Sequence, residues 1–106
     1  MSENDIQTLK LREEIFNKAL DGSKKSTSRL GIRDIKLGSL KLVMTEDESK
    51  STIVEVISCK LIDFKSITDQ EAVLEGYKTA EELKNILTEI YGPLNEDDVL
   101  TLIEWS

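Results

Sequence analysis

The sequence predicts an α+β fold, in which a curled β-sheet forms a small open barrel with helices packed around it. Three observations support this prediction. Residues 51–64 form a long run rich in β-branched and apolar side chains. Residues 68–75 and 79–91 instead carry helix start and stop signals. Strands and helices do not alternate along the chain, which argues against a parallel sheet built from βαβ units.

An N-terminal amphipathic helix is expected over residues 4–20. Apolar side chains recur there at helical spacing, and Leu9, Phe16 and Leu20 fall near one face. Gly22 suits the left-handed position that commonly follows the last turn of a helix. The segment after Gly22 is therefore expected to leave the helix in a new direction.

Three strands are expected in the middle of the chain. The first lies within residues 25–30 and the second at 39–45. An acidic turn at 46–49 precedes the third, which is the run at 51–64. That run is longer than a typical strand, so we expect a bulge or a bend within it.

Two helices and a final strand complete the predicted order. Thr68 begins a short helix with a capping-box sequence, and Gly76 ends it. Thr79 begins a longer helix, which Gly92-Pro93 terminates. A last strand is expected at 99–105, giving the order α-β-β-β-α-α-β.

Length and composition exclude several classes of function. The 106 residues suit a single domain, residues 1–106, and they include no histidine and only one cysteine, Cys59. Catalytic triads or dyads that need histidine are excluded, as are zinc sites built from histidine or several thiolates. We expect no metal and no cofactor. A lone cysteine, an acidic N-terminus and the absence of a long apolar run predict a cytoplasmic protein without a membrane span.

The charge is distributed unevenly along the chain. The net charge is −7, which disfavours a protein that coats nucleic acid through its phosphates. Residues 18–36 nevertheless hold six basic and two acidic side chains, a net of +4, whereas the remainder carries −11. A basic segment on an acidic body predicts a focused site for an anion or a polar ligand.

A basic segment rich in hydroxyl groups spans residues 22–29. In an extended strand, Lys25, Thr27 and Arg29 would share one face, and Lys24 at the strand entrance would reach the same cleft. A buried threonine hydroxyl beside a lysine is the minimum for an activated oxygen nucleophile. The same pattern also fits a solvated basic edge strand, because edge strands often carry lysine. The residues alone leave both interpretations open.

Glu75 is the second candidate residue, in the last turn of the predicted short helix. The negative end of a helix dipole disfavours a carboxylate there, which suits a general acid or base. An exposed glutamate at the helix end is the alternative. Tyr77 and Trp105 have rings that can stack on a base, although a tryptophan in the final strand is also typical of core packing.

The spacing Gly22-x-Lys24-x-x-x-x-Arg29 resembles the G-x-K-x-x-x-x-R motif of the ASCH (activating-signal-cointegrator homology) domain family. The flanking segments agree with this resemblance. Lys36-Leu37-Gly38 resembles the glycine turn of the family, and the segments at 67–69, 75–77, 81–83 and 90–92 resemble its helical region and the approach to its last strand. The resemblance extends over about residues 12–105.

This resemblance implies a PUA-like open β-barrel with an N-terminal helix, a two-helix insertion before the last strand, and a cleft lined by the motif. The family is associated with RNA or nucleotide binding. Some small bacterial members are amidohydrolases that remove the acetyl group of N4-acetylcytidine with a lysine, a threonine three residues later and a glutamate. Lys24 and Thr27 match the first two by spacing and Glu75 matches the third by local context, so Lys24 would be the base, Thr27 the nucleophile and Glu75 the proton shuttle.

The same resemblance implies a ligand-binding set around these catalytic candidates, consisting of Gly22, Lys25, Arg29 and Tyr77. The expected ligand is a nucleoside, a nucleotide or a short single-stranded RNA, and the expected reaction needs no metal. A non-catalytic RNA- or nucleotide-binding module remains the alternative, supported by the basic segment.

Overall fold

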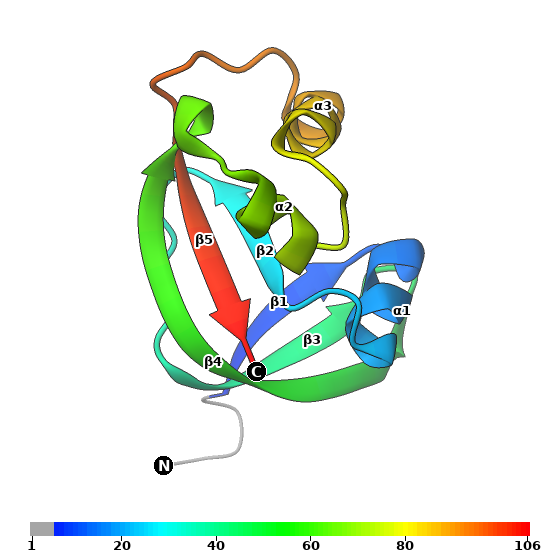
Figure 1. The fold of residues 1–106 in the computed structure, drawn as a ribbon. Helices are drawn as coiled ribbons and strands as arrows, with labels where there is room; N and C mark the ends of the chain where they lie inside the picture. Colours follow the sequence, from blue (N-terminus) through cyan, green and yellow to red (C-terminus); the bar gives the residue numbers. More distant parts are fainter. Residues whose placement is uncertain (1–5) are drawn as a thin grey trace.

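The computed structural model describes residues 6–106 and shows five strands with three α-helices and a short 3-10 helix (Figure 1). Their order is β1 (Gln7–Leu11), α1 (Glu13–Asp21), β2 (Ser26–Leu30), β3 (Gly38–Met44), β4 (Asp47–Asp63), the 3-10 helix (Phe64–Ser66), α2 (Asp69–Leu74), α3 (Ala80–Tyr91) and β5 (Val99–Trp105). The predicted α+β class is confirmed. Within residues 6–106, no helix has the length and apolar character needed to cross a membrane.

The strands form one curled sheet, a half-barrel with the strand order β1-β3-β4-β5-β2. β1 runs parallel to β3, and the other neighbours are antiparallel. β1 and β2 are therefore the two edges of the sheet. The curl brings these edges near each other, and the Arg29 guanidinium on β2 donates a hydrogen bond to the Lys10 carbonyl on β1 at 2.9 Å. The space between the two edge strands is called the seam below.

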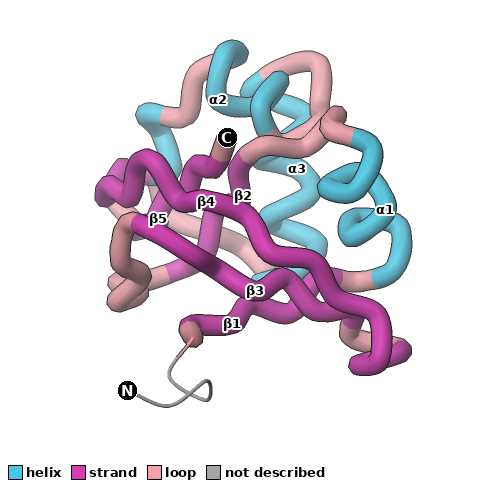
Figure 2. The backbone as a smooth tube through the Cα atoms, turned by 90° about the horizontal axis from the view of Figure 1, so that it is seen from below, coloured by secondary structure: helices cyan, strands magenta, loops and turns pink. Residues whose placement is uncertain are grey.

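The helices gather on one side of the sheet, as Figure 2 shows. α1 packs on a first core cluster, which consists of Leu11, Phe16, Leu40, Leu42, Met44, Val56, Ile103 and Trp105. α2 and α3 cover a second cluster, formed by Ile67, Ala72, Leu83, Leu87 and Leu100. β5 supplies residues to both clusters, so this strand joins the two halves of the core.

The predicted N-terminal helix is wrong in its first half. Gln7–Leu11 form the strand β1, and the helix begins only at Glu13. Burial alternates along β1 with a period of two, and parallel pairing with β3 satisfies its backbone groups. The apolar residues of this segment fit both the helical spacing and the alternation of a strand, and pairing with β3 favours the strand. Residues 4 and 5 of the predicted helix lie outside the described residues.

The central strands follow the prediction with shifted boundaries. β4 begins at Asp47 and is 17 residues long, so the turn occupies Thr45 and Glu46 and not 46–49. The expected irregularity is present, because the register against β5 shifts between Val56 and Ser58. A bulge at this position increases the local twist and helps so long a strand to bend around the half-barrel.

The helix signals are confirmed. Thr68 and Glu71 form a complete capping box at the start of α2. The Thr79 hydroxyl accepts a hydrogen bond from the Glu82 N–H at the start of α3. Gly76 follows α2 with a φ of +93°, a conformation that disfavours any residue with a side chain. The same turn lets the Tyr77 N–H donate back to the Ala72 carbonyl of α2 at 2.9 Å.

Replacing a core leucine of the sheet should test the packing. Leu42 is fully buried in β3, whereas Leu61 in β4 is 53% exposed. Leu42→Ala should lower the free energy of unfolding by about 2–5 kcal/mol, because it leaves a cavity in the first core cluster. Leu61→Ala makes the same chemical change and should cost less than about 1 kcal/mol. Urea denaturation measures both; equal losses would contradict this core assignment.

A candidate active site at the seam of the half-barrel

A cavity of about 340 Å³ opens at the seam. Its lining comes from β1, from β2, from the segment that follows α2, and from α3. Leu11 belongs to the first core cluster and Leu83 and Leu87 to the second, so the cavity lies at the junction of the two clusters. Its walls are therefore apolar on the α3 side and polar on the β2 side.

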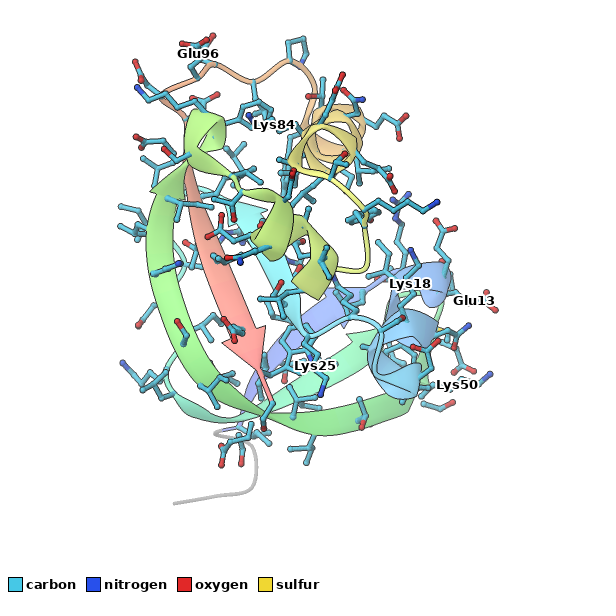
Figure 3. The ribbon with its side chains drawn as sticks, in the orientation of Figure 1. Glu13, Lys18, Lys25, Lys50, Lys84 and Glu96 are labelled. Atoms are coloured by element: carbon cyan, nitrogen blue, oxygen red, sulfur yellow. The ribbon has the colours of Figure 1, made fainter. Side chains whose placement is uncertain are left out.

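Five of the residues identified from the sequence meet in this cavity: Lys24, Thr27, Arg29, Glu75 and Tyr77 all belong to its lining. They come from β2 and its entrance, and from the turn after α2, which lies about fifty residues further along the chain. The other two, Gly22 and Lys25, lie outside the lining. Gly22 holds the left-handed turn after α1 with a φ of +88°, and the Lys25 side chain is exposed at the start of β2 (Figure 3).

Lys24 is buried, with only 3% of its surface exposed. The turn at Gly22 brings its backbone back to α1, where the Lys24 N–H donates to the Lys18 carbonyl at 3.1 Å. The interpretation of this segment as a solvated edge therefore fails for Lys24, although β2 is an edge strand. Sequence alternation alone does not separate a buried Lys24 from an exposed Lys25, because both precede the strand itself.

Glu75 is equally buried, at 3% exposure, and is not an exposed residue at the end of a helix. The end of α2 is attached to β2 by a backbone hydrogen bond from the Lys25 N–H to the Leu74 carbonyl. The Glu75 carboxylate accepts two further bonds from β2, one from the Ser28 N–H at 3.1 Å and one from the Ser28 hydroxyl. Ser28 is thus a site residue that the sequence interpretation missed.

Lys24 and Glu75 form a buried ion pair, with 3.6 Å between Lys24 Nζ and Glu75 Oε1. Burial disfavours the charged ammonium and lowers the pKa of Lys24 to about 8, against the opposing attraction of Glu75. Repulsion from the Arg29 and Lys18 cations contributes to this lowering of the Lys24 pKa. A lysine with a pKa near neutrality is able to accept and release a proton under ordinary conditions.

Thr27 lines the same cavity as this pair, and it pairs with Ile103 in the sheet. Thr27 is buried, with only 5% of its surface exposed. Within the described residues, no hydrogen bond engages the Thr27 hydroxyl, and none joins it to Lys24 Nζ. The hydroxyl is therefore available to a molecule that enters the cavity.

Arg29 and Tyr77 complete the polar side. One Arg29 nitrogen is engaged by the Lys10 carbonyl, and the buried Nε has no partner within the described chain. Burial lowers the pKa of Arg29, yet a guanidinium stays charged in proteins. The Tyr77 ring carries the Lys18 ammonium 4.9 Å from its centre, and burial raises the pKa of the phenol.

Metal chemistry finds no obvious ligand set here. Within residues 6–106, no group of three or more aspartate, glutamate or cysteine side chains is arranged to hold a metal ion.

Trp105 is 3% exposed and belongs to the first core cluster, so it packs in the core and does not line the cavity.

The sequence matches the family model of the ASCH domain over residues 5–106. The chain therefore belongs to the ASCH domain family, as the motif spacing indicated. No curated protein matches the sequence significantly.

Three solved structures share the fold. An ASCH domain from Lactobacillus crispatus JV V101 superposes with a TM-score of 0.71 at 18% identity, over 100% of this chain and 85% of that one. A protein from Enterococcus faecalis V583 gives 0.69 at 11% identity, over 95% and 79%. A hypothetical protein, PH0355, gives 0.63 at 23% identity, over 94% and 98%. Likeness at these identities establishes the fold.

Removing the charge of Glu75 should lower the pKa of Lys24 further. Glu75 attracts the Lys24 ammonium, so Glu75→Gln removes the interaction that opposes burial, and the pKa should fall below its value of about 8. NMR titration of the lysine side chains measures the shift. Glu81→Gln, on the exposed first turn of α3, is the matched control and should leave Lys24 unchanged. A Lys24 pKa that rises or stays constant in Glu75→Gln would contradict the ion pair.

Proposed function

We propose that this ASCH domain is an amidohydrolase that removes an acyl group from a modified nucleoside such as N4-acetylcytidine. One observation carries the proposal: a buried lysine–glutamate pair and an unengaged threonine hydroxyl line the same cavity. A positioned base, a nucleophile and a group that orients the base form the general arrangement for covalent acyl transfer. Lys24, Thr27 and Glu75 also match the family's hydrolase residues by position.

The proposed reaction proceeds through an ester on Thr27. Neutral Lys24 accepts the proton of the Thr27 hydroxyl as the oxygen attacks the acyl carbon. Glu75 takes this proton from Lys24 and delivers it to the leaving nitrogen when the carbon–nitrogen bond breaks. Water then hydrolyses the acetyl ester, which releases acetate and restores the hydroxyl. The mechanism requires Lys24 to come within hydrogen-bonding distance of Thr27 once substrate fills the cavity.

The acidity of Lys24 suits this role. A pKa of about 8 leaves roughly a tenth of the molecules with a neutral Lys24 at pH 7, against roughly one in three thousand for an ordinary lysine. Glu75 is adjacent, and its attraction for the Lys24 ammonium keeps the pKa of Lys24 from falling further. The pair therefore combines a usable fraction of free base with a short path for the proton.

A non-catalytic nucleotide-binding module is the second candidate. It is favoured by the four basic residues of the lining, Lys10, Arg12, Lys24 and Arg29, which face a single acidic one, Glu75. A phosphate would find complementary charge there. On this alternative, the cavity binds a nucleotide and leaves it unchanged.

Turnover of N4-acetylcytidine distinguishes the two candidates. The purified protein should release cytidine and acetate without added metal, as chromatography of the products measures. Lys24→Ala and Thr27→Ala should abolish the release, and Glu75→Gln should slow it by about two to four orders of magnitude, the usual contribution of a positioned proton-transfer group.

The controls for this experiment are Lys78→Ala and Thr88→Ala, which replace exposed residues outside the cavity and should retain full activity. Thermal denaturation checks that each inactive variant is still folded. A wild-type protein that binds cytidine monophosphate but releases no cytidine over hours would support the binding module. Full activity of Lys24→Ala would refute the mechanism even if the substrate were right.

The rate should depend on pH through Lys24. The reactive form is the neutral amine, so kcat/KM should rise with pH and level off above a pKa of about 8. The rate rises with pH because a general base is active only when deprotonated. A kcat/KM that falls as the pH rises through about 8 would exclude Lys24 as the general base. Initial rates between pH 6 and 10 measure the dependence, with urea denaturation at each end to confirm that the fold persists.

A further inference from the structure

Ser28 holds both oxygens of the Glu75 carboxylate. Its backbone N–H donates to Oε1 at 3.1 Å, and its hydroxyl donates to Oε2. Ser28 is buried, with 5% of its surface exposed, and it lines the cavity. The Lys24 ammonium lies 3.6 Å from Oε1, as the ion-pair partner of the same carboxylate.

The neighbouring serine on the same strand shows that this contact is specific. Ser26 is fully buried two residues earlier in β2, yet its hydroxyl has no hydrogen-bond partner within the described chain. Burial of a serine in this strand therefore does not by itself produce a contact with Glu75. Alternation along the strand puts both serines on the same face, and of the two only Ser28 donates to Glu75, through both its hydroxyl and its backbone N–H.

We propose that Ser28 is a positioning residue for the proposed amide hydrolysis, which fixes the orientation of the Glu75 carboxylate and holds Oε1 at its present 3.6 Å from Lys24 Nζ. This inference rests on the proposed function. A carboxylate held by one donor can rotate about its last bond, whereas one held at both oxygens by the same residue cannot. The fixed orientation keeps Oε1 in the path of the proton that leaves Lys24.

The charge of Glu75 makes this contact strong. Hydrogen bonds to a carboxylate are about twice as strong as those between neutral groups. Without the Ser28 hydroxyl, Oε2 would be left buried and unsatisfied, which is costly. The carboxylate would then be free to close on the Lys24 ammonium, beyond its present 3.6 Å, and would leave the position suited to proton transfer.

Steady-state kinetics test the inference. Ser28→Ala should lower kcat for N4-acetylcytidine about tenfold to a hundredfold, the effect of a misplaced reacting group, and should leave KM within about twofold, because the serine acts through Glu75. Ser28→Thr keeps a hydroxyl and should recover most of the activity. Ser26→Ala removes an equally buried but unpartnered hydroxyl and should match the wild type. Equal rates in Ser28→Ala and Ser26→Ala would overturn the inference.

A double variant shows whether Ser28 acts through Glu75. Once Glu75→Gln has removed the charge, adding Ser28→Ala should cost little more, because both changes disable the same group. Losses that simply add, with each change costing its full factor in the double variant, would mean that Ser28 acts independently of Glu75 and would overturn the positioning role.

A measurement that needs no turnover separates this inference from the proposed function. The charged groups around Lys24 are Glu75 at the end of α2, Arg29 on β2 and Lys18 on α1. If Ser28→Ala frees the carboxylate to turn toward Lys24, NMR titration should show the Lys24 pKa rising, and Ser26→Ala should leave it unchanged. An unchanged Lys24 pKa in Ser28→Ala would refute the positioning contact. If the Lys24 pKa rises in Ser28→Ala but the wild-type protein shows no turnover, the hydrolase proposal alone is refuted.

Discussion

The buried pair of Lys24 and Glu75 is the interaction on which the site depends. Both residues are only 3% exposed, so each charge has lost most of its hydration. Each charge stabilises the other, because removing one partner of a buried pair leaves an uncompensated charge. The pair therefore links the end of α2 to the entrance of β2, alongside the backbone bond between Lys25 and Leu74. The catalytic candidates share a cavity because these two elements are held together.

The position of the site follows from the way the sheet ends. β1 and β2 are edge strands whose outer backbone groups have no strand partner, and such edges must be covered or filled to avoid pairing with other chains. Here Arg29 bridges the two edges through the Lys10 carbonyl, and α3 covers the opening with apolar side chains. Arg29 thus has a structural duty in addition to any contact with a ligand.

The sequence was most informative where a signal was local. Capping residues, helix-ending glycines and the bulge of the long strand depend on neighbours in the chain, and the structure confirms them. β1 could not be distinguished from the start of a helix, since Leu9 and Leu11 fit both periods and the partner strand lies about thirty residues away. Ser28 was missed for a similar reason: its role is visible only when Glu75, 47 residues later, folds against it. Lys24, Thr27 and Arg29 could be grouped from the sequence because one short segment carries all three, and they line one cavity.

The contrast between the acidic surface and the basic interior of the cavity bears on the choice between the two proposed functions. The net charge of −7 combines −11 outside residues 18–36 with +4 within them, and the cavity holds cations with Glu75 as their internal counterion. Long nucleic acids would approach this surface against repulsion, whereas a small polar molecule can enter without contacting it. A cavity built only to bind an anion would gain from a fully charged lysine. Burial instead makes Lys24 more acidic, which weakens anion binding and strengthens a base. The direction of that pKa shift is the physical argument for proposing chemistry over binding at this site.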